Sequence, residues 1–122
     1  MADEYFRKAI ELNPKDPVAL AFYGNFLGTY RNDSDKAEDY LQRALEILPD
    51  DDYILTIYAR FLWKIRGQMD KAQELYARAL ILHPDYDFLL QSYADYLRTV
   101  RGDAEKAQAL EQRLADLTTK SE

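Results

Sequence analysis

A repeat of 35 residues constrains the fold of this chain more than any other feature. The segment Tyr58–Leu62, Y-A-R-F-L, has one counterpart 35 residues earlier, Y-G-N-F-L, and another 35 residues later, Y-A-D-Y-L. The segment that follows repeats as well, since Asp35–Leu45 aligns with Asp70–Leu80. A fixed period of this length is typical of arrays in which each unit stacks on the next. Function must therefore be sought in what such an array can bind.

Composition narrows the classes of function. The 122 residues, 48% apolar and 31% charged, indicate one globular domain. Cysteine is absent, which excludes disulfides and thiolate chemistry. A net charge of -6 repels a phosphate backbone, so we expect no nucleic-acid partner. No apolar run is long enough for a membrane span and the N-terminus does not resemble a signal peptide, so we expect a soluble, cytoplasmic chain.

Apolar periodicity predicts seven helices and no strand. The breaks between them are set by proline, by aspartates suited to capping, and by Asn32, Gly67 and Gly102, which suit a left-handed helix end. Short loops make neighbouring helices antiparallel, and the resulting hairpins must stack to bury their second faces. The expected helices span roughly residues 2–12, 17–31, 35–48, 52–66, 69–82, 86–101 and 104–117.

These residues resemble the tetratricopeptide repeat family, whose pattern combines apolar and small positions with a closing proline. In the first copy the pattern is Leu20, Tyr23, Gly24, Leu27, Ala37, Leu41 and Pro49. The resemblance implies an all-α, right-handed superhelix of stacked antiparallel hairpins, forming one domain over residues 1–122. We place the copies at about 2–36, 37–71 and 72–106, a terminal half-repeat at 107–117 and a tail at 118–122. Close helix approach is expected where small residues recur, at Gly24, Ala59 and Ala94 against Ala37, Ala72 and Ala107.

The chain departs from the family pattern in three ways. Its period is 35 rather than 34, leucine stands where the family has tryptophan, and tyrosine stands where the family has leucine on the first helix of each hairpin. We expect the extra residue to lengthen the end of each first helix and to alter the superhelical pitch. The half-a-TPR repeat of RNA-processing scaffolds is an alternative that the aromatic content suggests. It is disfavoured because the small residues and the prolines of the tetratricopeptide pattern are kept.

In the family, one face of the first helices lines a concave groove. Asn25 resembles an asparagine of the carboxylate clamp in members that bind chaperone tails, but Ala21, Ile57, Phe88 and Ser92 replace the other clamp residues, so that ligand is not expected. We expect a protein-interaction module that binds a peptide or a helix, with Tyr53 and Trp63 either anchoring it or shielding the packing between repeats. The alternative is a structural, assembly or engineered repeat scaffold without a native ligand. Besides Val18 and Ala21, the face presents Asn25, Tyr53, Thr56, Arg60, Trp63, Phe88, Gln91, Asp95 and Arg98.

The remaining polar features have structural explanations. His83 lacks partners for catalysis or metal binding, and the acidic group Asp50–Asp52 lacks the spacing of a calcium loop and suits helix capping. Arg31, Arg66 and Arg101 recur near helix ends, where cations complement the helix dipole. We expect no enzyme activity, no cofactor and no metal. The apolar N-terminal helix, with Tyr5, Phe6 and Ile10, predicts a monomer with weak homodimerisation.

Overall fold

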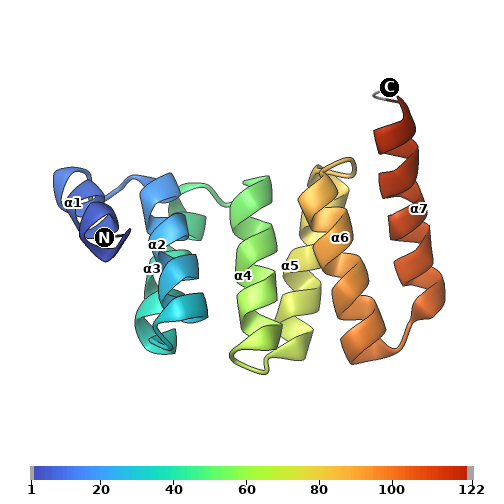
Figure 1. Cartoon of the computed structure of the whole chain (residues 1–122), viewed down its shortest axis with the longest axis horizontal. Coiled ribbons are helices and arrows are strands. Elements are labelled where there is room, and N and C mark those ends of the chain that lie inside the picture. Colours follow the sequence, from blue (N-terminus) through green and yellow to red (C-terminus); the bar gives the residue numbers. More distant parts are fainter. Residues whose placement is uncertain (1, 121–122) are drawn as a thin grey trace.

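The structure, a computed structural model, describes the backbone of residues 2–120 and is helical throughout that range apart from short turns. Figure 1 shows the helices arranged side by side along the molecule. The all-helical prediction is confirmed for these residues, and the last helix continues into the expected tail; residues 1, 121 and 122 lie outside the described part. The elements are α1 (Ala2–Leu12), α2 (Pro17–Tyr30), α3 (Ser34–Ile47), α4 (Asp52–Lys64), α5 (Met69–Leu82), α6 (Asp87–Tyr96), the π-helical turn η1 (Leu97–Arg101) and α7 (Ala104–Lys120).

Aspartates begin four of the helices, as the sequence predicts. Asp16 accepts hydrogen bonds from the backbone N–H groups of Val18 and Ala19 at the start of α2. Asp51 caps α4 by accepting from Ile54 N–H at 2.9 Å. The same arrangement starts α3 and α7, with the caps Asp33 and Asp103. Each cap satisfies a backbone donor that the first helical turn leaves unpaired.

The first helices of the three hairpins end in the same way. Asn32, Gly67 and Gly102 all have left-handed backbones, with φ of 54°, 69° and 62°. After each of them, a backbone N–H reaches back six positions to a helix carbonyl: Asp33 to Leu27, Gln68 to Leu62 and Asp103 to Leu97. This bond is the usual closure of a helix by a left-handed residue, and in the third copy the last turn is the π-helical η1. The lengthening of the first helices relative to a 34-residue repeat stays a prediction.

Three hairpins, α2/α3, α4/α5 and α6/α7, form the array, and α4 also packs against α2 and α6. The small residues lie at the closest approaches. A Cβ on Gly24 would come within 2.9 Å of Leu41 Cγ and 3.0 Å of the Ala37 carbonyl oxygen. Ala37, Ala59, Ala72 and Ala107 are completely buried. The predicted close contact is therefore confirmed for Gly24 and Ala37 in the first hairpin, and the corresponding alanines of the other two hairpins are buried.

A polar chain lies inside the second and third hairpins. Tyr76 is fully buried, its hydroxyl accepts a hydrogen bond from Trp63 Nε1 at 2.9 Å, and it lies 2.7 Å from Ser92 Oγ. Its ring stacks on Tyr93 with 4.9 Å between the centroids. Burial raises the pKa of Tyr76 to about 12. The chain joins α4, α5 and α6 with all of its buried polar groups paired.

Arginine side chains also link successive hairpins. Arg66, after α4, forms ion pairs with Asp35 at 2.6 Å and Glu38 at 2.9 Å on α3. Arg101, one repeat later, pairs with Asp70 on α5 at 2.7 Å. The dipole interpretation of these arginines thus omitted their carboxylate partners. The carboxylates of Asp35 and Asp70 are exposed, so their pairs contribute modestly to stability, whereas the pair of Arg66 with Glu38 is partly buried.

Candidate functional site: a groove across α2, α4 and α6

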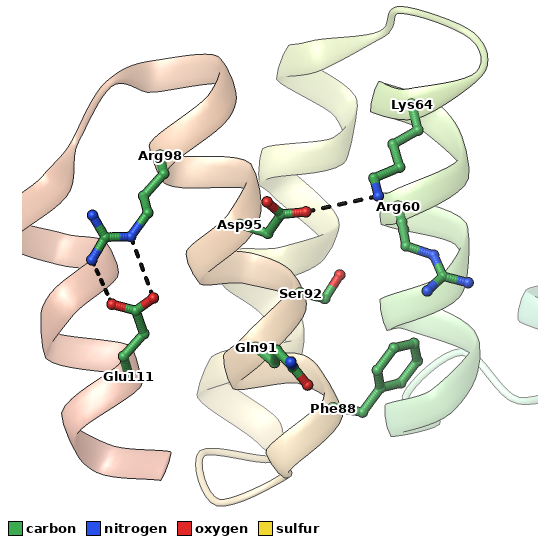
Figure 2. A pocket seen from close by; sticks show the side chains of 8 residues that line it. All are labelled: Arg60, Lys64, Phe88, Gln91, Ser92, Asp95, Arg98 and Glu111. Carbon is green, nitrogen blue, oxygen red and sulfur yellow. Dashed lines mark hydrogen bonds and ion pairs between the residues drawn. The ribbon is translucent and has the colours of Figure 1, made fainter. Parts of the chain in front are cut away.

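Two neighbouring hollows lie along the first helices of the hairpins and meet at α4. One is formed by α4, α6, η1 and α7, with a volume of about 470 Å³, and Figure 2 shows its side chains. The other lies between α2 and α4 and is lined by Asn25, Thr29 and Tyr30 among others. Arg60 and Lys64 line both hollows. Together they form the groove discussed below, with these two cations at its middle.

Arg60 is held in the groove by neutral groups. Its guanidinium donates to Asn25 Oδ1 on α2 at 3.3 Å and lies 5.3 Å from the ring centroid of Phe88 on α6. No carboxylate of the described residues forms an ion pair with it. An arginine held in place by an amide and an aromatic face keeps donors available for a carboxylate of another molecule.

The other two cations of the groove are neutralised within the chain. Lys64 Nζ lies 3.7 Å from Asp95 Oδ2, and Arg98 holds Glu111 with two hydrogen bonds, of 2.5 and 3.3 Å. The hydrogen bonds from Arg98 lower the pKa of Glu111 and raise that of the guanidinium. Figure 2 shows both pairs flanking the space in front of Gln91 and Ser92. Because these charges are compensated, Arg60 is the strongest anion-binding group that the groove presents.

An aromatic strip borders the groove near the helix starts. Phe22 and Tyr53 lie 5.1 Å apart between ring centroids, and Tyr53 and Phe88 lie 6.1 Å apart, so the strip crosses α2, α4 and α6. Tyr86 continues it, with its ring perpendicular to that of Phe88. Phe22 is 42% exposed and the ring of Tyr53 is half-buried. Burial raises the pKa of Tyr53, and the nearby charge of Arg60 acts in the opposite direction. The strip offers rigid apolar surface beside the cation.

The structure separates the expected groove residues into two groups. Thr56 is fully buried with its hydroxyl bonded to the Asp52 carbonyl, and Trp63 is 8% exposed with its indole against Tyr96. Ala21 is likewise buried. Of the two roles that the sequence left open for Trp63, its burial favours packing between hairpins over an exposed anchor for a ligand. The remaining expected residues line the hollows or border them: Asn25, Tyr53, Arg60, Phe88, Gln91, Asp95 and Arg98.

Sequence reasoning missed three lining residues of the hollow in Figure 2, which are Lys64, Ser92 and Glu111, and six of the other hollow, which are Gly28, Thr29, Tyr30, Asn32, Phe61 and Ile65. Lys64 lies one turn after Arg60, and Ser92 also contacts Tyr76 from its buried side. Glu111 stands where the earlier copies have the buried residues Leu41 and Tyr76. That loss of an apolar residue was visible in the sequence, and a charge at a core position is a signal that the local environment differs. Its partner, Arg98, could not be identified from periodicity alone.

His83 and the acidic group lie outside the groove. Asp50 pairs with Arg78 at 2.6 Å, its carbonyl oxygen lies 2.5 Å from His83 Nε2, and Asp51 is a helix cap. Among the side chains of residues 4–119, no three His, Asp or Glu groups come together in an arrangement suited to a metal ion. Across the same residues, none of the helices has the length and apolar character needed to cross a bilayer.

The geometry defines a class: a solenoid of helical hairpins with a groove on the face of its first helices. A family model described as tetratricopeptide repeat matches residues 29–92, just over half of the chain, and a second model of the same description matches residues 1–16. The chain belongs to the tetratricopeptide repeat family. Members of this family generally mediate protein–protein interaction or assembly, and the family is a non-catalytic repeat module. A comparison with curated proteins gives no match.

Proposed function

We propose that this chain is a protein-interaction module whose groove binds a peptide segment with a carboxylate beside an apolar side chain. Arg60 supplies the carboxylate contact, and the strip of Phe22, Tyr53 and Phe88 supplies the apolar contact. The observation that carries the proposal is the state of Arg60, which contacts an amide and an aromatic ring and forms no ion pair with a carboxylate of the described residues. The net charge of -6 makes a cationic groove stand out from the rest of the surface.

The arrangement limits the form of the ligand. Arg60 and Phe88 are in contact, so the carboxylate and the apolar side chain must lie close together on the ligand. The groove crosses three hairpins, so an extended segment or a single helix can follow it. Its preformed aromatic rings and the positioned guanidinium reduce the entropy lost on binding.

A peptide array tests the proposal. We would compare ten-residue peptides that contain Asp or Glu next to Leu or Phe with versions in which Asn or Gln replaces the acid. Hits would be measured by fluorescence anisotropy against the Arg60→Met variant. Since a charge-assisted hydrogen bond contributes about 1.5–3 kcal/mol, we expect binding to weaken by about tenfold or more.

Arg43→Met is the matched control, because Arg43 is an exposed arginine on α3 that pairs with Asp39 on its own helix. It removes the same charge and leaves the groove intact. If both variants weaken binding equally, the attraction is nonspecific and the groove assignment is wrong. The same follows if the amide peptides bind as well as the acidic ones.

A structural or assembly role without a peptide ligand is the competing function. It predicts that no peptide binds and that the mass of the particle rises with concentration. In solution we expect a monomer with at most weak association through the N-terminal helix. Light scattering over a hundredfold range of concentration separates the two functions.

A further inference from the structure

Another hollow lies on the side of α4 that faces away from the groove. Tyr58 and Leu62 of α4 line it, whereas Arg60 and Lys64 line the groove. Residues two positions apart on a helix point in nearly opposite directions. We call this space, with a volume of about 480 Å³, the rear hollow. It is lined by Gln42, Leu45 and Glu46 of α3, Tyr58 and Leu62 of α4, and Lys71, Glu74 and Leu75 of α5.

The rear hollow lies where a leucine takes the position of a tyrosine of the preceding copy. By the 35-residue shift, Leu75 is equivalent to Tyr40, and Tyr58 is equivalent to Tyr23. In the preceding copy the ring of Tyr40 packs on that of Tyr23, with centroids 5.2 Å apart. Leu75 is smaller than a tyrosine and leaves more space beside Tyr58. The floor of the rear hollow is apolar, since Tyr58 and Leu62 are buried and Leu75 is partly buried.

The rim of the rear hollow carries a carboxylate whose expected partner is engaged elsewhere. Asp39, which is equivalent to Glu74, pairs with Arg43 one turn later on its own helix at 2.9 Å. The corresponding arginine of α5 is Arg78, and it pairs instead with Asp50 at 2.6 Å. Glu74 is exposed and takes part in none of the ion pairs of the described residues. Its carboxylate is therefore available to a cation of another molecule.

The second acidic residue of the rim is Glu46 on α3. It is also exposed, and it too takes part in none of the ion pairs of the described residues. One repeat later, Ile81 and Ala109 have the positions of Glu46 and Glu74, so the repeat itself does not require acidic residues here. Lys71 is the basic residue of the lining. With two carboxylates and one ammonium group, the rim is negative on balance.

We propose that the rear hollow binds a basic segment of another protein, with an apolar side chain in the hollow and flanking arginine or lysine side chains on Glu46 and Glu74. The charges are complementary, and the net charge of -6 attracts a cationic segment to this chain. The apolar floor suits a leucine side chain and the aliphatic stems of the flanking cations. A second copy of this acidic chain is a poorer occupant, because like charges repel. The site is separate from the groove and does not depend on the function proposed above.

The probe is a fluorescein-labelled synthetic peptide with the sequence Gly-Arg-Arg-Leu-Leu-Arg-Arg-Gly. We would titrate the full chain into it and measure anisotropy. One control peptide has serine in place of both leucines, and the other has glutamine in place of every arginine. We expect saturable binding of the probe and about tenfold weaker binding of each control, because one loses the apolar contact and the other loses the charge contacts.

Charge variants of the protein locate the contact. Glu46→Gln and Glu74→Gln change exposed side chains, so both variants should fold, and each should weaken binding by about two- to fivefold. Lys71→Gln should strengthen binding by a similar factor, because it removes a repelling charge beside the ligand. Glu105→Gln is the matched control, since Glu105 is an exposed acid on α7 outside the lining, and this variant should bind normally.

A filling variant tests the apolar part of the site. Leu75→Tyr introduces the residue that the preceding copy has at this position, so it should occupy the hollow without disturbing the helices. We expect its circular dichroism spectrum to be unchanged and its binding of the probe to be reduced at least tenfold. Arg60→Met should bind the probe normally, which distinguishes the rear hollow from the groove.

Several results would overturn the proposal. Absence of saturable binding, equal binding of the serine peptide, or equal weakening by Glu105→Gln would leave only nonspecific attraction between charges. Unchanged binding in both Glu46→Gln and Glu74→Gln, or in a folded Leu75→Tyr variant, would place the peptide elsewhere, as would loss of binding in Arg60→Met. A dimer in light scattering that Leu75→Tyr abolishes would show that a second copy occupies the hollow, and would also refute the proposal.

Discussion

Tyr76→Phe removes one oxygen atom from the middle of the buried polar chain. The hydroxyl of Tyr76 accepts from Trp63 Nε1 at 2.9 Å and lies 2.7 Å from Ser92 Oγ, in a residue with no exposed surface. Without it, the indole N–H has no partner inside the protein, and stranding such a donor costs about 1–3 kcal/mol. Ser92 can turn its hydroxyl to a helix carbonyl, which limits its own loss. We expect a loss of about 2 kcal/mol, or about 8 °C in Tm for a chain of 122 residues.

Urea denaturation followed by circular dichroism at 222 nm measures this loss. Tyr58→Phe is the comparison variant, because the Tyr58 hydroxyl donates to the partly buried Glu38 at 3.1 Å and does not hold a buried indole N–H. We expect this variant to lose about 0.5–1 kcal/mol. A double-mutant cycle with Trp63→Phe cancels the cavity that the smaller ring leaves and isolates the coupling of the indole with the hydroxyl. A loss below about 0.5 kcal/mol for Tyr76→Phe, together with negligible coupling, would refute the reasoning.

Three further predictions concern stability. Gly67→Ala should cost about 1 kcal/mol, because the left-handed φ of 69° strains any side chain, while Asn32→Gly should be neutral or stabilising; denaturant midpoints compare them, and equal effects would contradict the turn geometry. Trp63→Ala should cost about 3–5 kcal/mol and exceed the roughly 1–3 kcal/mol of Ala72→Leu, because the tryptophan is buried; thermal melts in which Ala72→Leu is worse would oppose this. Burial raises the pKa of Tyr58, Tyr76 and Tyr86 to about 12, above the roughly 10 of a tyrosine in an unfolded chain. The stability that these protonated tyrosines contribute is complete below pH 10 and is lost as the pH rises towards 12. Absorbance at 295 nm during alkaline unfolding should therefore show three tyrosines that ionise late.

The local features of the fold could be predicted because short-range chemistry determines them. Asp16 and Asp51 act on backbone groups two or three residues away, and Gly102 adopts its φ without help from distant parts of the chain. The 35-residue repeat then predicted which helices pair as antiparallel hairpins. Trp63 shows the limit of this reasoning. The positions equivalent to Trp63 are Gly28 in the first copy and the exposed Arg98 in the third, so the repeat does not predict burial here. Trp63 is buried because it packs on Tyr76 and Tyr96, which lie in other helices.

The face that carries the groove could be predicted because residues one repeat apart occupy equivalent positions on successive first helices. Residues one repeat apart, such as Asn25 and Arg60, were expected on one face, and they are hydrogen-bonded. Glu111 could not be placed, because its approach to Arg98 follows from how α7 lies against η1. Lys64 depends in the same way on Asp95 of the next hairpin. Partners within a helix follow from periodicity, whereas partners across hairpins depend on packing angles that the pattern does not specify.

Glu111 has a consequence for lengthening this protein by gene duplication. It replaces the core residues Leu41 and Tyr76 of the earlier copies, and it is half-exposed and paired with Arg98. A hairpin appended after α7 would cover this carboxylate and remove the pair from water, at a cost that no internal junction incurs. A 35-residue unit copied between α3 and α4 would instead reproduce junctions that already exist, including the Arg66 contacts with Asp35 and Glu38. A further unit is therefore accommodated between α3 and α4 at a lower cost than directly after α7.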